Sequence, residues 1–386
     1  MKYNPGKYMG SGDRFLMQVI LAVFVMMACC EAYGEPGQYL QVTGPCNFRF
    51  PKDHGAHRGY RTEWWYYTGN METQTGRRFG FQVTFFRTQI VPPNTPMRRP
   101  KVSSSWRTEQ LYLAHAALSD LKEKAFYMDE QVARGAVGLA GEQRQADNIQ
   151  VFLGDWSVRI DSRAHLLRVA SDEVALNLRA VSRKGPVGHG DRGYSRKGEK
   201  PESASCYYSL PRLQISGDVA VRGKTYAVTG TGWMDHEFSS APLEKNLIGW
   251  DWFSLQLSNQ TEIMLYLLRK ETGGFSQASS GTFVGPSGEA HHLSREDFTV
   301  DVLKHWRSSR TEALYPAHWE IHMPSLGLAL EVIPQMADQE MVTEKSTGVT
   351  YWEGSVSVQG SASGTPVTGV GYVELTGYDK PVQLRR

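Results

Sequence analysis

The chain has 386 residues, enough for two domains that each bury a core of their own. Its formal net charge is only +2, and its 42 basic residues are spread along the chain rather than clustered. This distribution excludes the concentrated positive surface of a nucleic-acid-binding protein, so no nucleic-acid partner is expected.

The first 32 residues have the features of an export signal. Lys2, Lys7 and Arg14 give a positive start, and an apolar run follows at 15–28, broken only by Gln18. This run is short for a membrane span. The segment therefore predicts an exported protein.

Two processing sites fit this segment. Cleavage after Ala32 would release an untethered chain, whereas cleavage before Cys29 would leave a cysteine that carries a lipid. The methionines before Cys29 match the lipid pattern poorly. We expect a protein of the periplasm, or one attached to the envelope as a lipoprotein.

Export would place the cysteines in a compartment where disulfides form. After cleavage at Ala32, only Cys46 and Cys206 remain. They could pair or stay as two separate buried thiols, and the sequence leaves both readings open.

Short runs that alternate apolar and polar residues fill most of the mature chain, separated by Gly, Asn, Asp and Pro. In chain order, the clearest runs are 77–87, 111–120, 224–233, 262–270 and 371–378. With 38 glycines and 43 aromatic residues, the pattern predicts antiparallel β-structure, as a sandwich or a barrel.

Three other stretches depart from this pattern. A weak helical pattern lies at 128–133. The stretches 92–105 and 183–205 are rich in Pro, Ser or Gly and are expected to be loops. Loops of this length are commonly binding loops or lids, or they are disordered.

Strand parity shows which polar residues share a face with apolar ones. In 249–257, Asp251 shares the face of Phe253 and Leu255, opposite Trp250 and Trp252. Burial raises the pKa of a carboxyl group unless a cation or several donors compensate. Asp251 is therefore a candidate general acid.

Four more polar residues fall on apolar faces by the same test: Glu63, His115, His236 and Arg269. A single inward polar residue is commonly a satisfied core group. An ion pair of Asp251 with Arg269 is the structural alternative, and it would lower the pKa of the acid. Several such groups in one apolar interior indicate a ligand or catalytic site.

Metal and cofactor sites are not indicated. Asp235 and Glu237 face away from His236 on a regular strand, so these three neighbours cannot bind one metal ion together. The sequence has no Cys/His zinc spacing, P-loop, dinucleotide fingerprint, HExxH or GxSxG motif. We expect no metal and no cofactor.

Eight motifs in a fixed order resemble the AttH/CrtC family, from about His54 to the C-terminus. This family groups exported AttH-type proteins, often described as secreted hydrolases, with carotenoid 1,2-hydratases. The motifs are "TEWWYYTGN" (62–70), "AHAALSD" (114–120), "GYSRKG" (193–198), "YYSLPRLQISG" (207–217), "GWMDHEF" (232–238), "GWDWFSLQL" (249–257), "YWEG" (351–354) and "GYVELTGY" (371–378).

The resemblance implies an all-β fold of two lipocalin-like antiparallel β-barrels packed side by side. Its domains would span 33–238 and 239–386, with the boundary near 225–245. A weak internal similarity fits two such domains. The stretches 63–87 and 249–270 each run from an aromatic strand through a polar turn into an apolar strand that ends on a basic residue.

For the hydratase branch, the resemblance implies that an acid protonates a double bond and that water captures the resulting carbocation. Aromatic faces would stabilise this cation. The Asp–His pair of the family corresponds to Asp235 and His236, and the acid of its second motif to Asp251. Phe238 stands where hydratases tend to have Trp, so the chain resembles the AttH branch more closely.

We predict that the protein handles an apolar, isoprenoid or lipid-like molecule, either as a hydratase or isomerase or as a carrier that works with an ABC-type transporter. Asp251 is the expected proton donor, which His236 or Asp235 would tune. The residues expected to bind the substrate are Trp64, Trp65, Glu63, His115, Trp250, Trp252, Tyr266 and Arg269.

Overall fold

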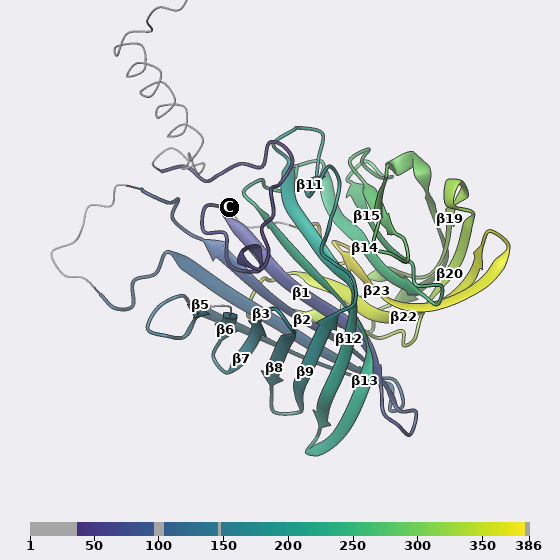
Figure 1. Ribbon diagram of the computed structural model, residues 1–386, viewed down its shortest axis with the longest axis horizontal. Helices are drawn as coiled ribbons and strands as arrows, with labels where there is room; N and C mark the ends of the chain where they lie inside the picture. Colours follow the sequence, from purple (N-terminus) through teal and green to yellow (C-terminus); the bar gives the residue numbers. More distant parts are fainter. Residues whose placement is uncertain (1–36, 96–103, 146–147, 383–386) are drawn as a thin grey trace, which may run out of the picture.

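The computed structural model describes residues 37–95, 104–145 and 148–382 (Figure 1). The predicted export signal, with Cys29 and Ala32, lies outside the described residues. Within the described ranges, no helix is long and apolar enough to cross a membrane. Three single 3-10 turns occur there: η1 (Lys52–His54), η2 (Arg295–Asp297) and η3 (Pro324–Leu326).

The first sheet is antiparallel and curls into a nearly closed barrel (Figure 1). Its strand order is β4-β3-β2-β1-β13-β12-β9-β8-β7-β6-β5, and β10 and β11 pair with β12. Contacts of β6 with β3 and β4 bring the two ends of the sheet together. The strands are β1 (Thr62–Glu72), β2 (Arg78–Gln89), β3 (Gln110–Asp120), β4 (Ala125–Arg134), β5 (Ala140–Gln145), β6 (Asn148–Leu153), β7 (Trp156–Ile160), β8 (His165–Ala170), β9 (Val174–Ser182), β10 (Val187–Gly188), β11 (Tyr194–Arg196), β12 (Ala204–Val221) and β13 (Lys224–Ser239).

The second sheet is also antiparallel and forms a half-barrel beside the first (Figure 1). Its order is β17-β16-β15-β14-β23-β22-β20-β19-β18, and β21 pairs with β22. The strands are β14 (Leu247–Leu257), β15 (Glu262–Lys270), β16 (Ser280–Val284), β17 (Ala290–Leu293), β18 (Thr299–Arg307), β19 (Leu314–Met323), β20 (Leu328–Pro334), β21 (Glu340–Val342), β22 (Thr350–Ala362) and β23 (Thr365–Thr376).

This architecture confirms the predicted all-β, lipocalin-like fold with two curled sheets side by side. The helical interpretation of 128–133 is wrong, because these residues belong to β4 and pair with β3 along their whole length. The stretch 183–205 is ordered rather than disordered, since it contains β10 and β11, which pair with β12.

The inner face of each sheet carries the apolar residues that strand parity predicts. Phe79, Phe81 and Phe85 of β2 lie in the core of the first barrel. Phe253 and Leu255 of β14 lie in the core of the second. Each barrel thus has its own core, and its interior is filled by side chains.

The outer faces of the two sheets pack against each other and form a third core. Tyr66, Tyr207 and Trp233 come from the first sheet, and Trp252 and Tyr266 come from the second. The two sheets also approach closely where β2 meets β22 and β23. A Cβ atom on Gly80 would lie only 2.7 Å from Ser355 Cβ and from Tyr372 Oη. Only glycine fits at such a close approach.

An ionic cluster also links the two barrels. Glu262 of β15 is fully buried. Its carboxylate accepts a hydrogen bond from Lys184 Nζ at 2.7 Å and another from the guanidinium of Arg212 in β12. Because both cations come from the first barrel, the contact fixes the position of one barrel on the other.

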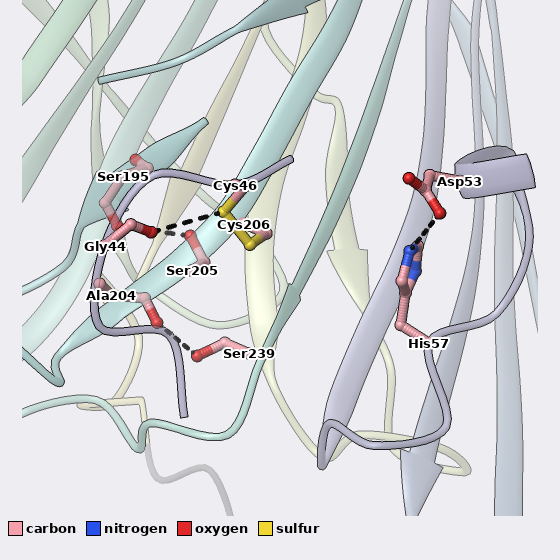
Figure 2. Close-up of a disulfide and its surroundings, with 9 residues drawn as sticks. All are labelled: Gly44, Cys46, Asp53, His57, Ser195, Ala204, Ser205, Cys206 and Ser239. Atoms are coloured by element: carbon pink, nitrogen blue, oxygen red, sulfur yellow. Dashed lines mark hydrogen bonds and ion pairs between the residues drawn. A yellow bond between two sulfur atoms is a disulfide. The ribbon is translucent and has the colours of Figure 1, made fainter. Parts of the chain in front are cut away.

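Cys46 and Cys206 form a disulfide (Figure 2). It joins the segment before η1 to β12 and closes a loop with a sequence separation of 160 residues. The sequence left open whether these cysteines pair or stay as separate thiols, and in the structure they are paired. The tethered segment leads directly into η1 and the residues around His57.

Removal of this disulfide is expected to lower the free energy of unfolding by about 2–4 kcal/mol, because a cross-link that closes a long loop restricts the unfolded chain. Urea unfolding of the Cys46→Ala/Cys206→Ala variant measures the loss. Reductant should destabilise the wild type and leave this variant unchanged. Equal unfolding curves for the two proteins would contradict the prediction.

Candidate active site between the barrels

The residues predicted for the site fall into three places. Inside the first barrel lie Glu63, Trp65 and His236. Between the barrels lie Trp64, His115, Asp235, Trp250, Trp252 and Tyr266. Inside the second barrel lie Asp251 and Arg269. The structure therefore brings Asp235 close to the tryptophans and separates it from both Asp251 and His236.

His115 lies on the opposite face from the one that its strand pattern predicts. Its Nδ1 atom is 2.8 Å from Tyr351 Oη, and its Nε2 atom is 2.8 Å from Ser346 Oγ, both in the second half of the chain. The prediction is wrong because β3 is buried on both faces. Leu118 faces the barrel core, whereas Leu113 lies on the outer face with His115. Apolar residues thus occupy both faces of β3, and they do not show which face points into the barrel.

Asp251 forms the ion pair that the sequence offered as the structural alternative. Arg269 Nε lies 3.1 Å from its Oδ1 atom, and Tyr378 Oη lies 3.0 Å from both carboxylate oxygens. Burial nevertheless raises the pKa of Asp251 to about 6, against the opposing effect of Arg269. Both of these partners lie in the second barrel, so Asp251 forms a core ion pair there.

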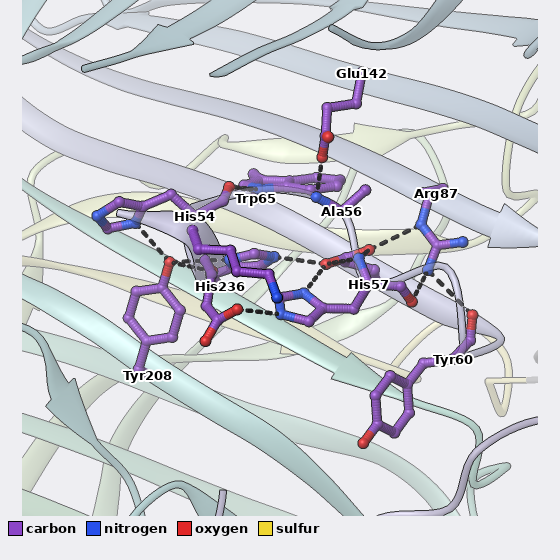
Figure 3. Close-up of polar contacts among 12 residues, drawn as sticks. His54, Ala56, His57, Tyr60, Trp65, Arg87, Glu142, Tyr208 and His236 are labelled. Carbon is purple, nitrogen blue, oxygen red and sulfur yellow. Dashed lines mark hydrogen bonds and ion pairs between the residues drawn. The ribbon is translucent and has the colours of Figure 1, made fainter. Parts of the chain in front are cut away.

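In the first barrel, Glu63 is an ionised acceptor that contacts His57, Arg87 and His236, the three residues labelled in Figure 3. Its Oε1 atom is 2.7 Å from His57 Nδ1 and 2.8 Å from His236 Nε2, and its Oε2 atom is 2.8 Å from Arg87 Nε. Burial alone would raise the pKa of Glu63, but Arg87 and His57 hold it well below its usual range. This carboxylate cannot act as a proton donor near neutral pH.

Asp235 faces the second barrel from β13. It accepts hydrogen bonds from Tyr207 Oη at 2.5 Å, from Trp233 Nε1 at 2.6 Å and from Ser209 Oγ. Burial raises its pKa to about 7, although the three donors oppose this shift. Its carboxyl group is thus held in one orientation in an aromatic setting.

Two further carboxyl groups face Asp235 from the second barrel. Glu353 and Glu374 stand directly opposite each other on β22 and β23. Burial and the charge of Glu374 raise the pKa of Glu353 well above its usual value. Burial, together with the charge of Asp235, raises the pKa of Glu374 to about 8. The pair therefore keeps at least one proton at neutral pH, as closely spaced carboxyl groups do.

Two buried polar atoms lie beside the carboxyl pair. Within the described part of the chain, neither Glu353 Oε1 nor Tyr66 Oη makes a hydrogen bond of ordinary geometry, although each group shifts the pKa of the other. Such atoms pair with each other after a small movement, or they bind water or a ligand. Glu374 is only partly buried, whereas Glu353 is buried, so Glu374 is the member of the pair that is accessible to solvent.

Aromatic rings surround these acids. Trp252 meets Tyr66 edge to face at 5.1 Å between ring centroids, and it meets Trp233 at 6.4 Å. At the edge of the cluster, Lys197 Nζ lies 4.1 Å from the ring centroid of Tyr266. Ring faces of this kind attract positive charge. The site therefore combines protonated carboxyl groups with surfaces that stabilise a cation.

Sequence reasoning missed Glu353, Glu374 and Tyr66. Both glutamates lie in motifs that carry the family resemblance, but their parity sets them opposite the apolar residues of their strands. This pattern is typical of a solvent-exposed glutamate. Only the packing of the two sheets reveals that the outer face is buried.

Comparison with known proteins agrees with this architecture. A model of the AttH-like family matches residues 41–378. The crystal structure of a candidate AttH from Nitrosomonas europaea has a TM-score of 0.76 and 34% identity, covering 88% of this chain and 100% of that chain. Kievitone hydratase from Nectria haematococca has a TM-score of 0.64 at 15% identity, covering 90% and 97%, and is similar in fold. A search of curated proteins found no significant match. The chain belongs to the AttH-like family.

Proposed function

We propose that this protein adds water to a carbon–carbon double bond of an apolar, isoprenoid-like molecule at the interface between its two barrels. The observation that carries the proposal is the Glu353–Glu374 pair, which holds a proton beside aromatic rings. The fold shared with a protein named kievitone hydratase supports the choice of reaction.

In the proposed reaction, a carboxylic acid of the pair transfers its proton to one carbon of the double bond. The other carbon becomes a carbocation, which the faces of Trp252 and Tyr66 stabilise. Water then attacks the cation and returns a proton to the carboxylate. The acid is regenerated, and the net change is the addition of one water molecule.

Asp235 has a supporting role in this proposal. Its three donors fix its carboxyl group on the wall opposite the glutamate pair. From there it orients the attacking water and disfavours ionisation of Glu374. Trp64 and Trp250, which are only partly buried, line the outer edge of the aromatic cluster.

We further propose that the protein works outside the cytoplasm, in the periplasm or on the envelope. The disulfide between Cys46 and Cys206 supports this location, because such bonds persist in oxidising compartments. The mature chain would occur there in one of two forms: it would begin at a lipid-modified Cys29, or it would begin after Ala32 without a lipid.

Mass spectrometry in oxygen-18 water tests the reaction. The mature protein is incubated with unsaturated isoprenoids, polyene lipids and kievitone. The molecular masses of the bound and the released compounds are then measured. A compound released with one labelled water added supports hydration. A compound that binds and leaves unchanged contradicts it and favours a carrier, and an ABC-type transporter is then the partner to test.

The rate of hydration is expected to fall about ten-fold per pH unit above pH 8. Glu374 has a raised pKa of about 8, so its proton is present below this pH and is lost above it. Rate measurements on the labelled product from pH 6 to about 10 check the profile. A rate that rises through this range would contradict an acid with this pKa.

A further inference from the structure

We propose that His57, Glu63 and His236 bind a divalent transition-metal ion, such as Zn²⁺, at the mouth of the first barrel. One ligand atom from each residue lies within 4.8 Å of the other two. Two imidazole nitrogens and one carboxylate oxygen form a ligand set that zinc commonly uses, with a fourth position left for water.

The contacts among the three residues show where the ion would sit. Glu63 Oε1 now accepts hydrogen bonds from both rings, at 2.7 Å from His57 Nδ1 and 2.8 Å from His236 Nε2. An ion placed among these three atoms replaces the two ring protons that share this oxygen. Small movements of the two rings are enough, because zinc bonds are about 2.0–2.2 Å long.

Each of the three ligands has a supporting partner on its far side, and two of these partners, Tyr208 and Arg87, are labelled in Figure 3. His57 Nε2 lies 3.4 Å from Asp53 Oδ1, and His236 Nδ1 lies 2.9 Å from Tyr208 Oη. Metal-binding histidines usually direct their second ring nitrogen to such a group, which orients the ring.

Arg87 supports the third ligand without competing for the ion. Its Nε atom donates to Glu63 Oε2 at 2.8 Å, and the backbone N–H of His57 is shared between Oε2 at 2.9 Å and Oε1 at 3.1 Å. Arg87 thus binds Oε2, and Oε1 is the oxygen that points to the two imidazole rings and would bind the metal ion. Hydrogen bonds of this kind to the second oxygen are also common for carboxylates that bind metals.

The site opens to solvent at His57. The side chains of Glu63 and His236 are fully buried, whereas 18% of the His57 side chain is exposed. His57 lines an open groove of about 420 Å³ next to Cys46 and Phe238. An ion that enters from this groove meets His57 first and the two buried ligands behind it.

The proposed ligands explain why the sequence did not indicate a metal site. His57 follows η1, Glu63 lies in β1, and His236 lies in β13. The triplet around His236 cannot bind one ion by itself, because Asp235 and Glu237 face the other side of the strand. The pairing of β1 with β13 places Glu63 next to His236.

Zinc binding to the purified full-length mature protein tests the proposal. Equilibrium dialysis against Zn²⁺, followed by metal analysis, gives the stoichiometry and affinity for the wild type, His57→Phe and the surface control His305→Phe. Phenylalanine at 57 keeps the ring that stacks on Phe238 at 3.7 Å, so the fold should persist. Thermal unfolding without zinc checks this for each variant.

We expect one zinc ion per chain in the wild type and in His305→Phe. Loss of His57 should weaken binding by about 100-fold or more, since loss of a group that only supports a ligand already reduces affinity 10–100-fold. Equal binding by wild type and His57→Phe, or no binding by the wild type at micromolar zinc, would overturn the proposal.

Cobalt provides a second measurement that does not depend on affinity. Co²⁺ bound by these side chains should give visible absorption bands in the wild type that are missing in His57→Phe. Glu374→Gln, which alters the proposed hydration site, should bind metal normally. Failure of the hydration proposal and failure of the metal proposal are thus distinguishable.

Discussion

Replacement of Glu374 by Gln is expected to lower the turnover number of hydration by about 10²–10⁴-fold, the usual contribution of a general acid. Glutamine keeps the size of the side chain but has no acidic proton. Because the raised pKa of Glu374, about 8, leaves this side chain neutral at pH 7, the substitution replaces one neutral group by another opposite Glu353. The folded protein should therefore be retained, and the loss should appear in turnover.

Asp251→Asn is the matched control for this experiment. Asp251 is also a buried acid with a raised pKa, but it is held inside the second barrel by Arg269 and Tyr378. We expect this variant to unfold more easily and to keep its turnover, in contrast to the hypothesis drawn from sequence. Loss of turnover in Asp251→Asn with normal turnover in Glu374→Gln would return the role of acid to Asp251.

Replacement of Glu262 by Gln is expected to lower the free energy of unfolding by about 3–5 kcal/mol, because removal of one partner leaves buried charge uncompensated. Glu262 is fully buried and neutralises both Lys184 and Arg212. These cations come from the other barrel, so the variant should also loosen the contact between the barrels. Urea unfolding followed by tryptophan fluorescence measures both effects.

The surface pair of Glu173 and Arg222 offers a control of the same chemistry. Their side chains are 57% and 69% exposed, and their N–O distance is 3.2 Å. Glu173→Gln should change the free energy of unfolding by less than about 1 kcal/mol, as is typical of exposed ion pairs. A similar effect of both substitutions would mean that burial of the Glu262 cluster contributes little to stability.

The sequence predicted the fold well because strand alternation is a local property. The runs 77–87 and 249–257 place their apolar residues inside a barrel, and Asp251 lies there with them. The helical pattern at 128–133 failed because pairing with β3, a contact between distant residues, decides the structure of β4.

The site was less predictable because it lies where both faces of a strand are buried. Alternation assumes that one face meets solvent, and this assumption assigned His115 to the wrong face. It also gave Glu353 and Glu374 the appearance of surface residues. Motifs identified the strands that form the interface, but only the packing of two sheets brings these side chains together.

The central position of β23 in the second sheet has a consequence for folding. This strand spans Thr365–Thr376 and lies between β14 and β22, so it is the last strand of the described residues and also one near the middle of its sheet. The half-barrel cannot close until this strand is in place. Trp233 and Tyr207 of the first barrel are covered by residues of the second sheet, so they stay uncovered until that sheet has formed. Loss of the C-terminal strand is therefore expected to expose an aromatic face of the first barrel as well as to open the second.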